Sequence, residues 1–263
     1  MGDDLILLLV GFVLTTVLGG ALGSFLQRRA WNEQHRTQKR DEANKQALAT
    51  FEEISRLFDK RIYRMRLLFT ALANARRDKG PADALTAARS EYRTVLMEWN
   101  DNLNRVLALT EVAFGDATRS TVEALNHRYA ALGRALDLVL RLDLRQDPEP
   151  IPLSSIDFPR RMKRLSDGVY DVNLRMLALL RDEGDPRPAD LPAPDGRPRL
   201  ALGDQDAAVR DLQASLGVDA DGSFGLTTYR AVRRFQEERG LKVDALVGPE
   251  TWRTLDAPPK QDP

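Results

Sequence analysis

The chain has 263 residues, no cysteine, and 39 basic against 39 acidic side chains. The missing cysteine excludes disulfides, thiolate metal sites and cysteine nucleophiles. The balanced charge lacks the basic excess with which most nucleic-acid-binding proteins meet their ligand, so we predict no nucleic-acid partner. Charged residues make up 30% and aromatic residues 6% of the chain, which together with abundant Leu, Ala and Arg favours an all-α fold over a β-sheet.

The first predicted element is a segment from Leu5 to Leu26 that contains no charged side chain. About 22 residues rising ~1.5 Å each match a hydrocarbon core of roughly 30 Å. We therefore predict a single transmembrane helix and assign residues 1–27 to a membrane anchor. A cleavable signal peptide is the alternative because small residues surround Gly23, but Asp3 and Asp4 stand where a signal peptide carries basic residues.

The charges around this segment bear on its orientation. Acidic residues precede it, and several basic residues from Arg28 to Lys45 follow it. Because basic flanks usually stay in the cytoplasm, the flank alone places the C-terminal part inside, although the rule is weak for large translocated domains. Gly19 and Gly23 form a small-xxx-small pair at which two such helices could meet, so self-association through the anchor stays open.

The next two predicted elements are a stalk and a bundle. Residues 28–46 are nearly all polar, which predicts a solvated helical stalk that adds roughly 30 Å of height. Beyond it, apolar residues recur three or four apart in four segments of residues 47–184. Four such stripes predict an up-and-down four-helix bundle around one shared core. The stripes begin at Ala47, Tyr92, Val122 and Met162.

The polar residues of this region give no sign of catalysis. His35 and His127 lack a partner at metal-ligand spacing, so we predict no metal and no cofactor. We recognise no transglycosylase, amidase or peptidase signature, and we predict that the chain is not an enzyme. A basic, aromatic cluster on the first bundle helix is interpreted as a solvated face with packed side-chain stems, with binding of an acidic partner as the alternative. The cluster consists of Arg61, Tyr63, Arg64 and Arg66.

A change in composition follows the bundle. Prolines recur through residues 185–199, which predicts an extended linker. Residues 200–256 then contain an internal repeat, in which Asp221–Thr228 is answered by Asp244–Thr251 about 23 residues later. In each copy a turn leads into a glycine that is placed to cap a helix. The pattern predicts a small three-helix domain, followed by a tail of residues 257–263.

An ordered series of turn and core residues runs through this domain: Leu202-Gly203, Val209, Leu212-Gln213, Leu216, Asp221-Gly222, Phe224-Gly225, Thr228, Ala231-Val232, Phe235-Gln236, Gly240-Leu241, Asp244, Val247-Gly248, Thr251-Trp252 and Leu255. The series resembles the peptidoglycan-binding domain family, which occurs on bacterial cell-wall hydrolases and their accessory proteins. Two glycines common in that family are replaced, by Asp206 before the first helix and by Ala245 in the second turn. Ala245 is strained if it adopts a positive φ, so this turn is expected to differ locally.

The resemblance implies non-catalytic recognition of cell-wall glycopeptide. Peptidoglycan stem peptides present carboxylates and amides, which guanidinium groups and side-chain amides suit. We therefore predict ligand contacts on the second helix of the domain, with an ordinary solvated helix face as the alternative for each residue. The candidates are Tyr229, Arg230, Arg233, Arg234 and Gln236.

These elements together predict a single-pass protein of the bacterial inner membrane whose bundle and C-terminal domain lie outside the cytoplasm. Its predicted partners are peptidoglycan and the lipid bilayer, and its predicted role is to tether or recruit at the cell wall. A cell-wall hydrolase as partner, or self-association, stays open. The alternative follows from the basic flank: a membrane-anchored cytoplasmic scaffold whose bundle and C-terminal domain bind protein partners.

Overall fold

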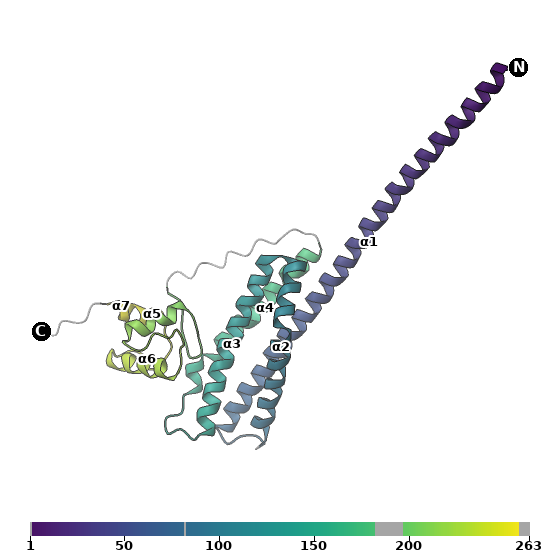
Figure 1. Cartoon of the computed structure of the whole chain (residues 1–263). Coiled ribbons are helices and arrows are strands. Elements are labelled where there is room, and N and C mark those ends of the chain that lie inside the picture. Colours follow the sequence, from purple (N-terminus) through teal and green to yellow (C-terminus); the bar gives the residue numbers. More distant parts are fainter. Residues whose placement is uncertain (1, 82, 182–196, 258–263) are drawn as a thin grey trace. The chain divides into compact units, whose positions relative to one another are not determined.

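The computed structural model describes residues 2–81, 83–181 and 197–257, and for residues 2–37 it describes only the backbone. Within these ranges the chain forms seven α-helices and one short 3-10 helix, with two isolated β-bridges and no strand (Figure 1). The predicted all-α fold is therefore confirmed. The chain divides into two compact units, residues 1–49 and 50–263, which we describe separately.

The first unit is the N-terminal part of α1, a helix that runs from Gly2 to Ala75. All side chains from Gln38 to Gln46 are exposed, as expected for a polar helix without an apolar stripe. Among the residues whose side chains are described, no helix is long and apolar enough to cross a bilayer. The predicted span from Leu5 to Leu26 lies outside those residues, so the membrane anchor stays a prediction.

The second unit begins with the rest of α1. It continues through α2 (Ala84–Phe114), α3 (Asp116–Leu144), the 3-10 helix η1 (Leu153–Ile156) and α4 (Phe158–Leu180). Helices α1 to α4 lie side by side, with α3 in contact with both α2 and α4 (Figure 1). A single residue, Gly115, separates α2 from α3, and its φ of 81° is a conformation that glycine adopts without strain. We call residues 50–180 the helical bundle.

The apolar stripes predicted from the periodicity are buried in the helical bundle. At its centre the ring of Phe58 lies 5.1 Å from that of Trp99 and 5.7 Å from that of Tyr129, measured between ring centroids. Each such side chain contributes about 1.5–3 kcal/mol through burial, so the stripes account for the packing of the helices. Other fully buried members are Ile54, Met65, Leu72, Val122, Leu132, Leu136, Val139 and Met176.

One residue of the predicted solvated cluster is buried. The Arg61 side chain is 1% exposed, whereas Tyr63 is 58% exposed and Arg66 is also exposed. The prediction of a solvated face is therefore wrong for Arg61. The physical reason is helical spacing: Arg61 follows Phe58 by three residues and precedes Met65 by four, which places all three on one face of α1.

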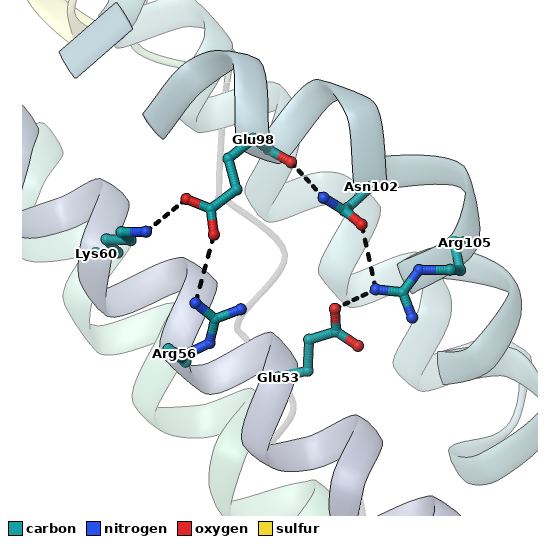
Figure 2. Close-up of polar contacts among 6 residues, drawn as sticks. All are labelled: Glu53, Arg56, Lys60, Glu98, Asn102 and Arg105. Atoms are coloured by element: carbon teal, nitrogen blue, oxygen red, sulfur yellow. Dashed lines mark hydrogen bonds and ion pairs between the residues drawn. The ribbon is translucent and has the colours of Figure 1, made fainter. Parts of the chain in front are cut away.

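Charged side chains join α1 to α2 on the outside of the helical bundle (Figure 2). Glu98 of α2 accepts hydrogen bonds from Lys60 Nζ at 2.5 Å and from Arg56 Nη1 at 3.4 Å, and Arg105 of α2 pairs with Glu53 of α1. The hydrogen bond from Lys60 lowers the pKa of Glu98. Because these pairs are partly exposed, each contributes at most about 1 kcal/mol, and they favour this pairing of the two helices without dominating stability.

Three short helices follow in the C-terminal part: α5 (Ala207–Ser215), α6 (Leu226–Glu238) and α7 (Pro249–Asp256). Asp206, which replaces a glycine of the family pattern, caps α5 by accepting a 2.9 Å hydrogen bond from the backbone N–H of Val209. Leu200 and Val247 exchange two backbone hydrogen bonds of 2.9 Å, which ties the start of this part to the turn before α7. The buried core consists of Leu202, Val209, Leu212, Phe224, Val232, Val247 and Trp252.

Candidate functional site

A buried glutamine holds the turn before α6. Gln213 is 1% exposed, and its Nε2 donates to Asp221 Oδ1 at 2.7 Å and to Thr228 Oγ1 at 2.9 Å. Its Oε1 accepts from the backbone N–H of Gly222 at 2.8 Å. The hydrogen bond from Gln213 lowers the pKa of Asp221, and a second bond from the backbone N–H of Ser223 acts in the same direction. One amide therefore fixes the turn that positions α6.

The second turn repeats this arrangement with Gln236, which is also 1% exposed. Its Oε1 accepts from the backbone N–H groups of Asp244 at 3.2 Å and Ala245 at 2.9 Å, and its Nε2 donates to the Leu246 carbonyl at 3.1 Å. Gln236 was predicted to contact ligand. The structure instead places its amide inside the turn with both ends hydrogen-bonded, and whether it also contacts ligand is still a prediction.

At one equivalent position the two turns have different residues, glycine and alanine, in a similar backbone conformation. Gly222 in the first turn has φ 77°, and Ala245 in the second has φ 58°. An L-residue pays about 1–2 kcal/mol in this left-handed region, whereas glycine pays almost nothing. The local strain that the sequence suggested for Ala245 is therefore present, and its buried methyl group and its backbone hydrogen bond to Gln236 stabilise the residue there.

Helix α6 presents a row of cations to solvent. Arg230, Arg233 and Arg234 are all exposed, and their spacing places them on adjoining faces of one helix. Arg230 lies 3.6 Å from a carboxylate oxygen of Glu149, a contact between two exposed groups that water can easily replace. Three of the five predicted ligand residues are therefore free to meet the carboxylates of a stem peptide.

The remaining candidate, Tyr229, is buried, although it lies one helical turn from the exposed Arg233. The guanidinium of Arg233 lies 5.9 Å from its ring centroid, which is within the range of a cation–π contact. Its hydroxyl is buried and has no hydrogen-bond partner among the described residues. The tyrosine ring therefore contacts Arg233 from within the core, and only the three arginines are exposed.

A loop that precedes α5 makes contacts that the sequence did not suggest. Asp204 accepts a 2.8 Å hydrogen bond from Arg161 Nη2 of α4, and the carbonyl of Gly203 accepts a 3.0 Å bond from Arg134 Nε of α3. Burial raises the pKa of Asp204, and burial likewise lowers the pKa of Arg161. A Cβ added to Gly203 would lie 2.2 Å from the Ala131 carbonyl oxygen, so this loop requires glycine.

In the part of the chain that the structure describes, no three His, Asp or Glu side chains gather as a metal site would require. What the C-terminal helices offer is a rigid small domain with an exposed cationic helix face. Guanidinium groups bind carboxylates through paired, charge-assisted hydrogen bonds. The arrangement is suited to binding an anionic or amide-rich polymer at a surface.

Residues 205–255 match the sequence family of the peptidoglycan binding domain. This segment is a peptidoglycan-binding domain. The resemblance seen in the sequence is confirmed for it, and peptidoglycan binding is the function that the match supports. The family does not cover the helical bundle.

The chain is also similar to three curated proteins over part of its length. An uncharacterised protein from the bpoA1 3′ region of Kitasatospora aureofaciens is 46% identical over 66 residues, which cover 22% of this chain and 56% of that protein. The N-acetylmuramoyl-L-alanine amidase CwlM of Mycobacterium tuberculosis is 45% identical over 49 residues, or 19% of this chain and 12% of the amidase. The spore cortex-lytic enzyme of Halalkalibacterium halodurans is 56% identical over 36 residues, or 14% of this chain and 11% of the enzyme.

The chain thus spans about half of the first relative and a small part of the other two. No solved structure is significantly similar to the chain. The similarity therefore concerns the peptidoglycan-binding domain, which the two named enzymes share with this protein.

Proposed function

We propose that the chain is a membrane-anchored, non-catalytic protein that binds peptidoglycan through its C-terminal domain and so tethers or recruits at the cell wall. The observation that carries the proposal is the match of residues 205–255 to the peptidoglycan binding domain family. The exposed arginines of α6 provide the chemistry, because stem-peptide carboxylates pair well with guanidinium groups.

The uncharged N-terminal segment supports the anchor, since its length suits a bilayer. The polar helix that follows adds reach, at ~1.5 Å for each of its residues, and the proline-rich sequence after the bundle adds more. A binding domain held in this way has a raised effective concentration at a wall some tens of ångströms away. In this proposal, the stalk and the linker allow the binding domain to reach the cell wall from the membrane.

The two enzyme relatives support a partner hydrolase. Their names describe an amidase and a cortex-lytic enzyme, and each shares with this chain only a short binding segment. A chain that carries such a segment without a recognised hydrolase signature is suited to hold an enzyme close to its substrate. We therefore include recruitment of a cell-wall hydrolase in the proposal.

Binding to purified sacculi tests the site. The full chain is expected to sediment with sacculi, and replacing Arg230, Arg233 and Arg234 together by glutamine should weaken binding at least tenfold, because charge-assisted hydrogen bonds are lost. The matched control replaces Arg77, Lys79 and Arg145, three exposed cations of the bundle and its loops, and changes net charge equally. Equal binding by the two triple variants would show that the α6 arginines do not contact peptidoglycan.

The orientation of the chain decides between this proposal and the cytoplasmic scaffold that the basic flank favours. A C-terminal tag should be removed by protease added to spheroplasts with a sealed inner membrane. A tag that is protected until the membrane is lysed would place the binding domain in the cytoplasm. The bundle and C-terminal domain would then be expected to bind protein partners there.

A further inference from the structure

The helical bundle contains a cavity, open to solvent on one side, that the peptidoglycan-binding function does not use. It lies between α1, α2 and α3 and has a volume of about 610 Å³, within the range of small-molecule sites in proteins. Leu68, Leu96 and Leu140 form part of its apolar wall. Four of its five charged lining side chains are arginines, and they decide what it can bind.

Arg61 is the deepest of these cations. Its guanidinium lies 5.0 Å from the Trp99 ring centroid and 4.7 Å from that of Tyr129, and its Nη1 donates to Asn126 Oδ1 at 3.1 Å. Asn126 Oδ1 also accepts from Trp99 Nε1 at 2.8 Å, which fixes the position of the amide. These neutral groups orient the guanidinium without neutralising its charge.

No described carboxylate lies within 4.0 Å of Arg61, whereas two partly buried arginines each pair with one. Arg76 pairs with Asp143 at 2.6 Å, and Arg161 pairs with Asp204 at 2.8 Å. A buried charge without a counter-ion is costly, and Arg61 Nε also lacks any hydrogen-bond partner among the described residues. A negative charge close to the guanidinium would offset this cost.

Tyr92 lines the same cavity, and its buried hydroxyl makes no hydrogen bond of standard geometry with a described residue, although the nearby Arg61 guanidinium partly opposes the rise that burial causes in its pKa. Gly133 on α3 leaves the room that this hydroxyl occupies, since a Cβ there would lie 2.8 Å from Tyr92 Oη. A phenol next to a buried guanidinium is a ready donor to an anionic oxygen. The Tyr92 hydroxyl and the Arg61 side chain, whose Nε lacks a partner, therefore line one cavity together.

The rim of the cavity has the same sign of charge. Arg89, Arg93 and Arg134 line it together with one acidic residue, Asp137. Asp137 pairs with Arg141 at 3.0 Å. None of the three rim arginines has a described carboxylate within 4.0 Å, the limit for an ion pair. Like charges around a mouth raise the local concentration of anions and speed their entry.

We propose that this cavity binds a small organic anion, whose phosphate or carboxylate group pairs with Arg61 and the Tyr92 hydroxyl and whose apolar body lies against the leucines. The residues that line the site all come from α1, α2 and α3, and one of them, Arg134, also donates to the Gly203 carbonyl in the loop before α5. For the basic cluster, the sequence left open binding of an acidic partner. In this proposal that alternative holds for Arg61, and the acidic partner is a small molecule.

Calorimetric titration of the full chain, in one non-ionic detergent throughout, tests the proposal. The probes are n-hexyl phosphate and hexanoate, with 1-hexanol as the neutral control. At least one of the two anions should bind tenfold or more tightly than hexanol, because its charged group then meets two buried donors. The anion that binds more tightly shows which head group, phosphate or carboxylate, the cavity prefers. The proposal is overturned if neither anion binds more tightly than hexanol.

Tyr92→Phe is the decisive variant, and Tyr63→Phe is its matched control on the exposed face of α1. Tyr92→Phe removes a hydroxyl that makes no hydrogen bond of standard geometry and has Arg61 as its polar neighbour, so thermal unfolding should change little while anion affinity falls about tenfold. Arg61→Met should abolish anion binding, and Arg61→Lys should restore part of it. Equal anion affinity of the two tyrosine variants would overturn the proposal even if Arg61→Met fails to fold.

Discussion

Replacing Gln236 by leucine separates a structural role from a ligand-binding one. The change keeps the volume of the side chain and removes the oxygen that accepts from the backbone N–H groups of Asp244 and Ala245. Ala245 is fully buried, so its N–H cannot turn to water instead. One buried donor left without a partner costs about 2 kcal/mol. A domain of this size has a free energy of unfolding of about 3–8 kcal/mol, so the loss is a large share.

Amide hydrogen exchange of the full chain, followed by mass spectrometry, measures this loss in the C-terminal domain alone. A loss of about 2 kcal/mol makes opening roughly thirtyfold more frequent, since 1.4 kcal/mol is a factor of ten. Peptides from residues 224–257 should therefore exchange about thirtyfold faster in Gln236→Leu, while peptides from the helical bundle keep their rates.

Gln205→Leu is the matched control, because Gln205 is exposed and its amide makes a single 3.2 Å bond to Ser223 Oγ. Its exchange rates should change by no more than about twofold. Unchanged exchange in Gln236→Leu together with lost sacculus binding would refute the reasoning. Gln236 would then be a ligand contact, as the sequence suggested, and the turn would not depend on its amide.

Three further predictions concern the loop before α5 and the two turns. Gly203→Ala should speed amide exchange in residues 201–204, because the new Cβ meets the Ala131 carbonyl oxygen at a cost of about 1–3 kcal/mol. In the control Gly217→Ala the new Cβ meets no atom within 4 Å, so the only cost is that of alanine at a positive φ. Asp206→Ala removes the cap of α5 and should cost about 1 kcal/mol, seen as roughly fivefold faster exchange there, while Asp211→Ala on the exposed side of the same helix should not. Carbon-13 NMR titration should show opposite pKa shifts for two aspartates, raised for Asp204 by burial and lowered for Asp221 by its hydrogen bond with Gln213. The stabilising contribution of Asp204 is therefore present below its unfolded-state pKa and is lost as pH rises through its raised folded-state pKa. The contribution of Asp221 is present above its unfolded-state pKa and is lost as pH falls through its lowered folded-state pKa. Equal titration midpoints for the two aspartates would contradict both assignments.

The helices could be predicted because each has an apolar stripe of helical period, which depends only on the order of residue types. The burial of Arg61 was missed because its charge was given more weight than its place between Phe58 and Met65 on the stripe of α1. The spacing alone contained the signal. What it could not show is that Trp99 and Tyr129, from two other helices, form the walls around the guanidinium.

The structural role of Gln236 could also have been found in the sequence. Gln213 precedes Asp221 by the same spacing at which Gln236 precedes Asp244, so the repeat contains its glutamine as well as its turn. The contacts of Asp204 had no such signal, because Arg161 is far away in the sequence and only the fold brings the two together. Pairings of that kind depend on tertiary packing and cannot be derived from local pattern.

Capture of membrane vesicles by sacculi tests the tether most directly. The full chain is reconstituted into lipid vesicles that contain a fluorescent lipid, and the vesicles are mixed with purified sacculi and sedimented at low speed. The tether requires that vesicles with the chain sediment with sacculi, that vesicles without it stay in solution, and that soluble muropeptides release them. Vesicles that carry the chain and still stay in solution would contradict it, most clearly if the same chain in detergent binds sacculi.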